Sequence, residues 1–180
     1  GRASSRSRPT RGPGATHAPV GVPTADQASP PLILFVGQVP SGHAGRGAFQ
    51  ELDYPAVFGP LAKWAAQVDD ASRIPEHVAR AFAVATAGRP GPVVLALPED
   101  VLDQETDADD AAPTEVPRPG PGDEELRRLG ELLAAAERPL VTVGEGGWSS
   151  QAGEDTVFFC EANAIPVAAA DAMNAHVSPR

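Results

Sequence analysis

Five consecutive apolar residues, Leu-Ile-Leu-Phe-Val at 32–36, constrain the fold of this chain more than any other feature. Apolar and polar residues do not alternate in this run, which is typical of a strand covered on both faces by helices in a parallel sheet. Gly37 follows the run, and a second run at 93–97 stops at Pro98. The two runs therefore predict two strands of one parallel sheet.

Helix and turn signals lie between these two strands. Residues 54–62 indicate a short helix interrupted by prolines, and 64–68 indicate a strand. Pro75 opens a longer helix at a position where its missing N–H does no harm, and Gly88 is suited to end it. Helical spacing places four residues on one apolar stripe: Val78, Ala81, Phe82 and Ala85. We predict an α/β fold, a parallel sheet in a three-layer α/β/α arrangement with right-handed crossovers.

Charge and composition narrow the functional classes. The formal net charge is −10, and arginines gather only at the start of the chain, so a nucleic-acid partner is not expected. Residues 1–11 are expected to form a disordered leader. No apolar run approaches the roughly 20 residues that cross a bilayer, so a membrane partner is not expected either. The single cysteine, Cys160, fits a buried thiol in a reducing cytoplasm.

The composition also predicts the domain organisation. Residues 12–98 form a first domain, and 99–122 are acidic and then rich in proline and glycine, as an extended linker would be. A divalent-metal site is the alternative for the acidic run, but a flexible segment offers no preorganised cage. Residues 123–180 form a second unit, of which only a first βαβ is expected. A helix with Asp123 as its N-cap opens it.

The second unit contains a candidate nucleotide site. Gly144, Gly146 and Gly147 lie between a strand expected at 140–143 and a helix expected at 149–164, before a further strand at 165–170. A dinucleotide pyrophosphate, as in FAD, can bind at such a helix N-terminus. The glycine pattern is incomplete because Ser149 stands where a third glycine is expected. A simple strand-to-helix turn is the alternative.

Acid–base chemistry is weakly indicated. The four histidines are scattered, without metal-ligand spacing. Glu51 and Asp53 would share a face in an extended loop, as a general acid–base pair needs. The alternative is that they cap the following helix or bind backbone amides. Gln50 is a neutral donor and acceptor that could contact a ligand.

Several motifs, in order, resemble those of thiamine-diphosphate-dependent enzymes of the acetolactate synthase type. They read RGPGAT at 11–16, PLILFVGQVP at 31–40, AFQELD at 48–53, GRPGPV at 88–93 and LPED at 97–100, and RPL at 138–140 is followed by GEGG at 144–147. The resemblance implies that 12–98 are part of a pyrimidine-binding domain. It also implies that 123–180 begin a Rossmann-like central domain that is truncated here.

The same resemblance implies a function and a set of site residues. The family decarboxylates 2-oxo acids and joins or protonates the product, using thiamine diphosphate and Mg²⁺ bound between subunits of a homodimer or homotetramer. Gln50, Gly14 and His17 would face the cofactor, with His17 standing where the family usually has asparagine. Neither the activating glutamate nor the metal-diphosphate motif of the family matches this chain, so we expect it to be inactive alone. The alternatives are a non-catalytic interaction fragment that pairs through a sheet edge, and the nucleotide-binding module.

Overall fold

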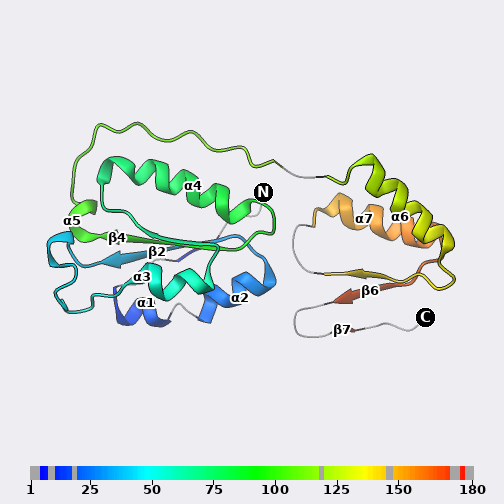
Figure 1. Ribbon diagram of the computed structural model, residues 1–180, viewed down its shortest axis with the longest axis horizontal. Coiled ribbons are helices and arrows are strands. Elements are labelled where there is room, and N and C mark those ends of the chain that lie inside the picture. Colours follow the sequence, from blue (N-terminus) through cyan, green and yellow to red (C-terminus); the bar gives the residue numbers. More distant parts are fainter. Residues whose placement is uncertain are drawn as a thin grey trace. The chain divides into compact units, whose positions relative to one another are not determined.

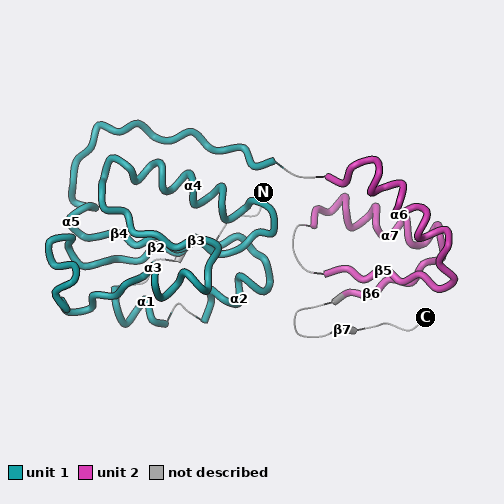
Figure 2. The backbone as a smooth tube through the Cα atoms, viewed as in Figure 1, with its two compact units in different colours: residues 1–117 teal, residues 118–180 magenta. Residues whose placement is uncertain are grey.

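The computed structural model describes residues 5–7, 11–17, 20–117, 120–144, 148–170 and 175–176. The chain divides into two compact units, Gly1–Pro117 and Arg118–Arg180, which Figure 2 colours separately. The boundary between the units falls inside the segment 99–122, where the composition predicts a linker.

The first unit contains a four-stranded parallel sheet in the order β1-β2-β4-β3. Its strands are β1 (Ser5–Ser7), β2 (Leu32–Gln38), β3 (Trp64–Gln67) and β4 (Pro92–Pro98). The predicted strands are present, and β2 and β4 pair along their whole length from Leu32 opposite Pro92 to Gln38 opposite Pro98. The prediction of a disordered leader is wrong at Ser5–Ser7, because these residues pair with the first half of β2.

Helices cover both faces of this sheet, as Figure 1 shows. The helices α1 (Pro13–His17), α2 (Gly21–Ala28) and α3 (Tyr54–Phe58) lie on one face, and α4 (Ile74–Thr86) lies on the other. Single-turn helices span Ser41–His43, Gly59–Leu61 and Ala71–Arg73. The predicted three-layer α/β/α arrangement is therefore confirmed.

Each face of the sheet has its own apolar core, because successive residues of a strand point to opposite faces. Leu34, Val36, Val94 and Ala96 pack with Tyr54 and Phe58 of α3. Ile33, Val93 and Leu95 pack with Ala81 and Ala85 of α4. The non-alternating runs of β2 and β4 are thus explained by burial on both sides.

Details of the helices differ from the sequence predictions. Helix α2 begins at Gly21, which leaves Pro23 in the first turn, where no N–H is needed, so this proline does not interrupt the helix. Pro75 opens α4 as predicted. The predicted apolar stripe is wrong at Phe82, which is 37% exposed, while Val84 packs against the core instead.

The end of α4 is held by a lysine from the next layer. Lys63 Nζ donates to the carbonyl oxygens of Val84, Ala87 and Arg89, at 2.6, 2.7 and 2.9 Å. These groups include carbonyls that the end of a helix leaves without a partner, and a cation is favoured there by the helix dipole. Gly88 adopts φ +55°, the left-handed conformation expected after a helix.

The linker begins later than predicted. Helix α5 (Glu99–Leu102) directly follows β4, and its Val101 is buried, so residues 99–102 belong to the first unit. Residues 103–117 have no regular secondary structure and are nearly all exposed.

The second unit contains α6 (Asp123–Ala135), β5 (Val141–Val143), α7 (Ser150–Ala162), β6 (Val167–Ala170) and β7 (Ala175–His176). Strands β5 and β6 are parallel, joined through α7, and β7 pairs antiparallel with β6. Asp123 is the first residue of α6 rather than its N-cap, which is Gly122. Ser149 caps α7 by accepting from the Ala152 amide, and Cys160 on this helix is buried. No helix in the part of the chain described above combines the length and apolarity that crossing a membrane requires.

Candidate functional site

The carboxyl ends of the strands in the first unit form the candidate site. Ligands of open parallel α/β sheets bind at this edge because the loops that follow the strands converge there. A pocket of about 280 Å³ lies at this edge. It is lined by Arg11, Gly37, Gln38, Leu97, Glu99, Leu102 and Asp103, which follow or end β1, β2 and β4.

Gln50 and the turn at Gly12 are packed directly against each other. A Cβ atom on Gly12 would lie 2.8 Å from Gln50 Cβ and 3.1 Å from Gln50 Cα, so only glycine fits. Both residues adopt left-handed backbone conformations, with φ +49° at Gly12 and +69° at Gln50. The Gly12 amide donates to the hydroxyl of the fully buried Tyr54 at 3.0 Å. The structure therefore joins the 11–17 turn to the loop that carries Gln50.

The other predicted cofactor residues, Gly14 and His17, lie on α1, which this turn begins. The Gly14 amide donates to the Arg11 carbonyl at 3.3 Å, and Gly14 is partly buried. His17 is exposed at the last residue of α1, and its Nδ1 lies 2.7 Å from the Pro13 carbonyl oxygen. The contact with Gln50 is made by Gly12, a residue that the sequence reasoning did not select.

The carboxylates of Glu51 and Asp53 accept hydrogen bonds from backbone amides. Glu51 Oε1 accepts from the Gly45 amide at 2.5 Å, and Oε2 accepts from the Ala48 amide at 3.0 Å. These hydrogen bonds, chiefly the one from Gly45, lower the pKa of Glu51 below its ordinary value. Asp53 Oδ1 accepts from the Ala56 amide at 3.0 Å and caps α3. The interpretation as amide-binding and capping residues is confirmed, and the geometry gives the acid–base pair no support.

Two further side chains anchor the loop between β2 and α3. Gln38, which is 5% exposed, donates through Nε2 to the Leu52 carbonyl at 2.7 Å and accepts from the Val39 amide at 2.9 Å. Asp100 of α5 accepts from the amide and hydroxyl of Ser41 at 2.9 and 3.2 Å, and the amide is the main cause of its lowered pKa. The sequence offered no signal for these contacts, because Asp100 is 59 residues away from Ser41.

An ion pair closes one side of the pocket. Arg11 Nη1 lies 3.0 Å from Glu99 Oε2, and a Cβ on Gly37 would lie 3.4 Å from Arg11 Cγ. A Cβ atom at that distance would be in ordinary van der Waals contact, so the Arg11 side chain packs beside Gly37 at the strand end.

The groups at this edge suit one part of thiamine diphosphate better than the other. An aminopyrimidine ring is uncharged and offers donors and acceptors, which the carboxamide of Gln50 and backbone groups of the turn can match. A diphosphate with Mg²⁺ needs oxygen ligands gathered around the ion. Among the described residues, no group of three or more His, Cys, Asp or Glu side chains could hold a metal ion. The residues present thus fit the pyrimidine end of the cofactor.

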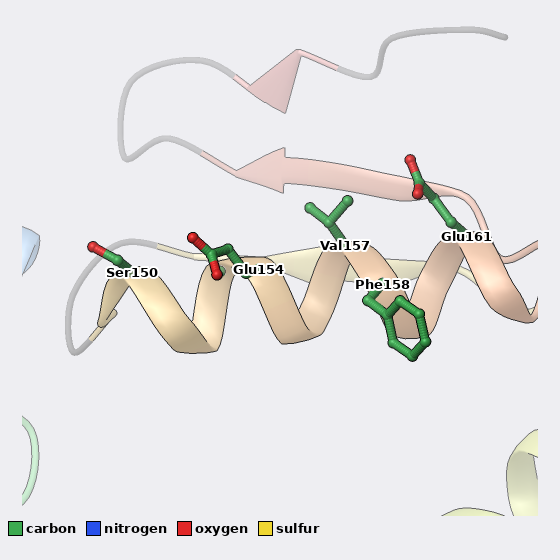
Figure 3. Close-up of a pocket in the computed structure, with 6 residues that line it drawn as sticks. Ser150, Glu154, Val157, Phe158 and Glu161 are labelled. Atoms are coloured by element: carbon green, nitrogen blue, oxygen red, sulfur yellow. The ribbon is translucent and has the colours of Figure 1, made fainter.

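In the second unit, the structure describes only part of the predicted nucleotide site. Gly144 is exposed directly after β5, and its carbonyl oxygen accepts from Trp148 Nε1 at 2.7 Å. Gly146 and Gly147 lie outside the described residues. A larger concavity of about 480 Å³ lies on α7, but all its lining residues come from that one helix, as Figure 3 shows. The concavity is therefore one face of helix α7.

Comparison with known proteins assigns the family. Residues 9–57 match the family model described as thiamine pyrophosphate enzyme, N-terminal TPP binding domain. The chain is 39% identical over 165 residues to a probable acetolactate synthase large subunit of Methanocaldococcus jannaschii, covering 88% of this chain and 28% of the relative. It is 35% identical to the acetolactate synthase large subunit of Corynebacterium glutamicum over 164 residues, 88% of this chain and 26% of that protein.

The isozyme 3 large subunit of acetolactate synthase from Escherichia coli is 35% identical over 164 residues, 88% of this chain and 29% of that protein. The chain thus spans less than a third of the length of these relatives. The family match at 9–57 covers the Gly12 turn, β2 and the Gln50 loop, which are the parts that form the candidate site. By these matches and motifs, the chain belongs to the acetolactate synthase-like family of thiamine-diphosphate-dependent enzymes.

Proposed function

We propose that this chain supplies the pyrimidine-side part of the active site in a carboligase or decarboxylase of 2-oxo acids that uses thiamine diphosphate. The observation that carries this proposal is the left-handed Gln50 packed on Gly12 at the carboxyl edge of the sheet. A strained non-glycine backbone persists only where the surrounding structure holds it, and such residues cluster at functional sites.

The chain's own residues would bind and orient the ring end of the cofactor. When bound, thiamine diphosphate supplies a carbanion that adds to the carbonyl group of a 2-oxo acid. Gln50 can donate and accept hydrogen bonds from a backbone position that is fixed before the ligand arrives, which lowers the entropic cost of binding. Gly14 and His17 would line the same turn.

Because no group of three or more His, Cys, Asp or Glu side chains among the described residues could hold a metal ion, we expect magnesium, the diphosphate contacts and the activating glutamate to be supplied by residues outside the described sheet edge. We therefore propose that residues 1–180 alone have no carboligase activity. The assay is carbon dioxide release from pyruvate with thiamine diphosphate and Mg²⁺, and turnover by the purified chain would contradict this proposal. A homodimer or homotetramer, transferase chemistry and a cytoplasmic location stay predictions.

A chimera tests the function itself. Residues 11–102 of this chain would replace the matching segment of the Methanocaldococcus jannaschii relative, and acetolactate formation would be measured. We expect an active chimera in which Gln50→Ala lowers kcat/KM about 10- to 100-fold, since a misplaced reactant costs about that much. Gln27→Ala on the exposed face of α2 is the matched control and should leave the rate unchanged. Equal rates for both variants would contradict the role of Gln50.

The two alternative functions predict different results. A nucleotide module at 144–147 would bind FAD with a saturable change of flavin fluorescence, which a Gly144→Val variant should abolish. A non-catalytic interaction fragment would co-elute with a full-length relative in size-exclusion chromatography and leave chimera activity independent of Gln50.

A further inference from the structure

We infer that Glu51 is a positioning residue for Gln50: its carboxylate holds the backbone of the 45–51 turn so that Gln50 stays in its left-handed conformation on Gly12. This inference rests on the proposed function for the role of Gln50, and it adds a residue to that site. Glu51 itself is placed in contact with the loop backbone, and it is not proposed to touch the cofactor.

The carboxylate of Glu51 accepts hydrogen bonds from backbone amides of the segment 45–48. One oxygen accepts from Gly45 at 2.5 Å and the other from Ala48 at 3.0 Å. The amides of Arg46 and Gly47 also help to lower the pKa of Glu51, although the Arg46 amide itself donates to the His43 carbonyl at 3.3 Å. Gly45 and Gly47 adopt φ +75° and +66°, and such left-handed residues let successive amides converge on an anion.

The same carboxylate closes the turn that contains Gln50. The Glu51 amide donates to the Ala48 carbonyl at 3.0 Å, while the Glu51 side chain accepts from the Ala48 amide. Residues 48–51 therefore form a four-residue turn whose two ends are joined twice. Gln50 is its third residue, a position with positive φ that glycine usually occupies.

A glutamine at this position needs support that a glycine would not. A left-handed conformation is unfavourable for a residue with a Cβ atom, because Cβ approaches the following carbonyl oxygen. The double link between Ala48 and Glu51 opposes relaxation of the turn, and Gly12 leaves room for Gln50 Cα and Cβ on the other side. The exposed Phe49, 88% accessible, contributes no packing that would hold the turn.

A carboxylate is required because both of its oxygens are used as acceptors. The carboxamide in a Glu51→Gln variant has one oxygen and would direct an NH₂ group at a backbone N–H, so one hydrogen bond is lost and two donors face each other. Asp53→Asn is the matched control, since it changes a nearby carboxylate that caps α3 and makes none of these contacts.

A double-mutant cycle separates positioning from simple loop support. Amide hydrogen exchange at Gly45 and Ala48 is measured by NMR in the 180-residue chain for wild type, Glu51→Gln, Gln50→Gly and the double variant. Glycine at 50 removes the strain, so the turn depends less on Glu51. We expect Glu51→Gln to accelerate amide exchange at Gly45 and Ala48 about tenfold when residue 50 is Gln, and less than about threefold when it is Gly. Asp53→Asn should leave the exchange rates of both amides unchanged.

Thiamine titration of wild type, Glu51→Gln and Asp53→Asn gives the second readout, the chemical-shift response at Gln50 per folded molecule. Glu51→Gln should weaken this response about threefold or more, and Asp53→Asn should leave it unchanged. Equal acceleration of exchange in both backgrounds, or none in either, would overturn the inference. A third outcome separates the two proposals: Glu51→Gln accelerates amide exchange more with Gln at 50 than with Gly at 50, but wild type shows no chemical-shift response to thiamine. Glu51 would then still be the residue that positions Gln50, and only the proposed function would be contradicted.

Discussion

Replacing Gly12 by alanine tests the central contact of the site. Two effects add in this variant. A Cβ at φ +49° costs about 1 kcal/mol of backbone strain. The same atom would lie 2.8 Å from Gln50 Cβ and 3.1 Å from Gln50 Cα, and relieving such overpacking costs about 1–3 kcal/mol. We therefore expect Gly12→Ala to lower the free energy of unfolding of the first unit by about 2–4 kcal/mol.

Gly88 provides a matched control. It has φ +55°, but no atom lies within 4 Å of a Cβ added there. Gly88→Ala should therefore show the backbone strain alone, about 1 kcal/mol. The difference between the two variants isolates the contact between Gly12 and Gln50.

The assay is urea unfolding followed by Trp64 fluorescence in a Trp148→Phe background, so that the signal reports on the first unit. With the same m-value in all variants, the midpoint shifts give the differences in unfolding free energy. A Gly12→Ala variant no less stable than Gly88→Ala would refute the packing of Gln50 on the turn.

Three further predictions follow from contacts outside that pair. Lys63→Met removes the cation that binds three carbonyls at the end of α4 and should lower the unfolding free energy by about 1–2 kcal/mol in the same urea assay, whereas Lys63→Arg should restore part of the loss. The pKa of Glu51 is lowered in the folded chain by backbone hydrogen bonds, chiefly from Gly45, so its contribution to stability is present above the ordinary glutamate pKa of 4.5 and is lost as pH falls through the lower folded pKa. The urea midpoint of wild type should accordingly fall more steeply than that of Glu51→Gln as the pH is lowered through and below 4.5, and parallel curves would contradict this. Cys160 is 3% exposed, so its thiol should react with Ellman's reagent far more slowly in buffer than in urea, and equal rates would show that the second unit is open.

The sheet of the first unit could be predicted because its strands carry a strong local signal. Residues 32–36 and 93–97 are apolar without alternation, and burial on both faces explains that pattern. The short β1 was missed because Ser-Arg-Ser at 5–7 has no apolar character, and its pairing with Leu32 to Leu34 depends on tertiary contact alone. Helical spacing predicts Phe82 in the core, but the spacing alone does not tell which of the apolar residues on α4 contact the sheet, and Phe82 is 37% exposed while Val84 packs against the core.

The site was predictable only where a motif or a local hydrogen bond carries it. The capping role of Asp53 and the amide binding of Glu51 follow from short-range geometry, and both are present. The partners of Gln50 were not predictable in the same way. Gly12 packs on Gln50, Tyr54 accepts from the Gly12 amide, and Asp100 accepts from the Ser41 amide. These residues come from separate elements, so only the assembled sheet edge brings them together.

The most direct test of the account is an NMR map of where thiamine binds on the wild-type chain. Half a site should bind weakly, with a Kd near 1 mM, which corresponds to about −4 kcal/mol. We predict that chemical-shift changes cluster at residues 12–17 and 48–52 and saturate together. Changes confined to the β5–α7 region around residues 141–152, or no saturable change at the Gly12 turn and Gln50, would contradict the claim that these two segments form one cofactor-facing site.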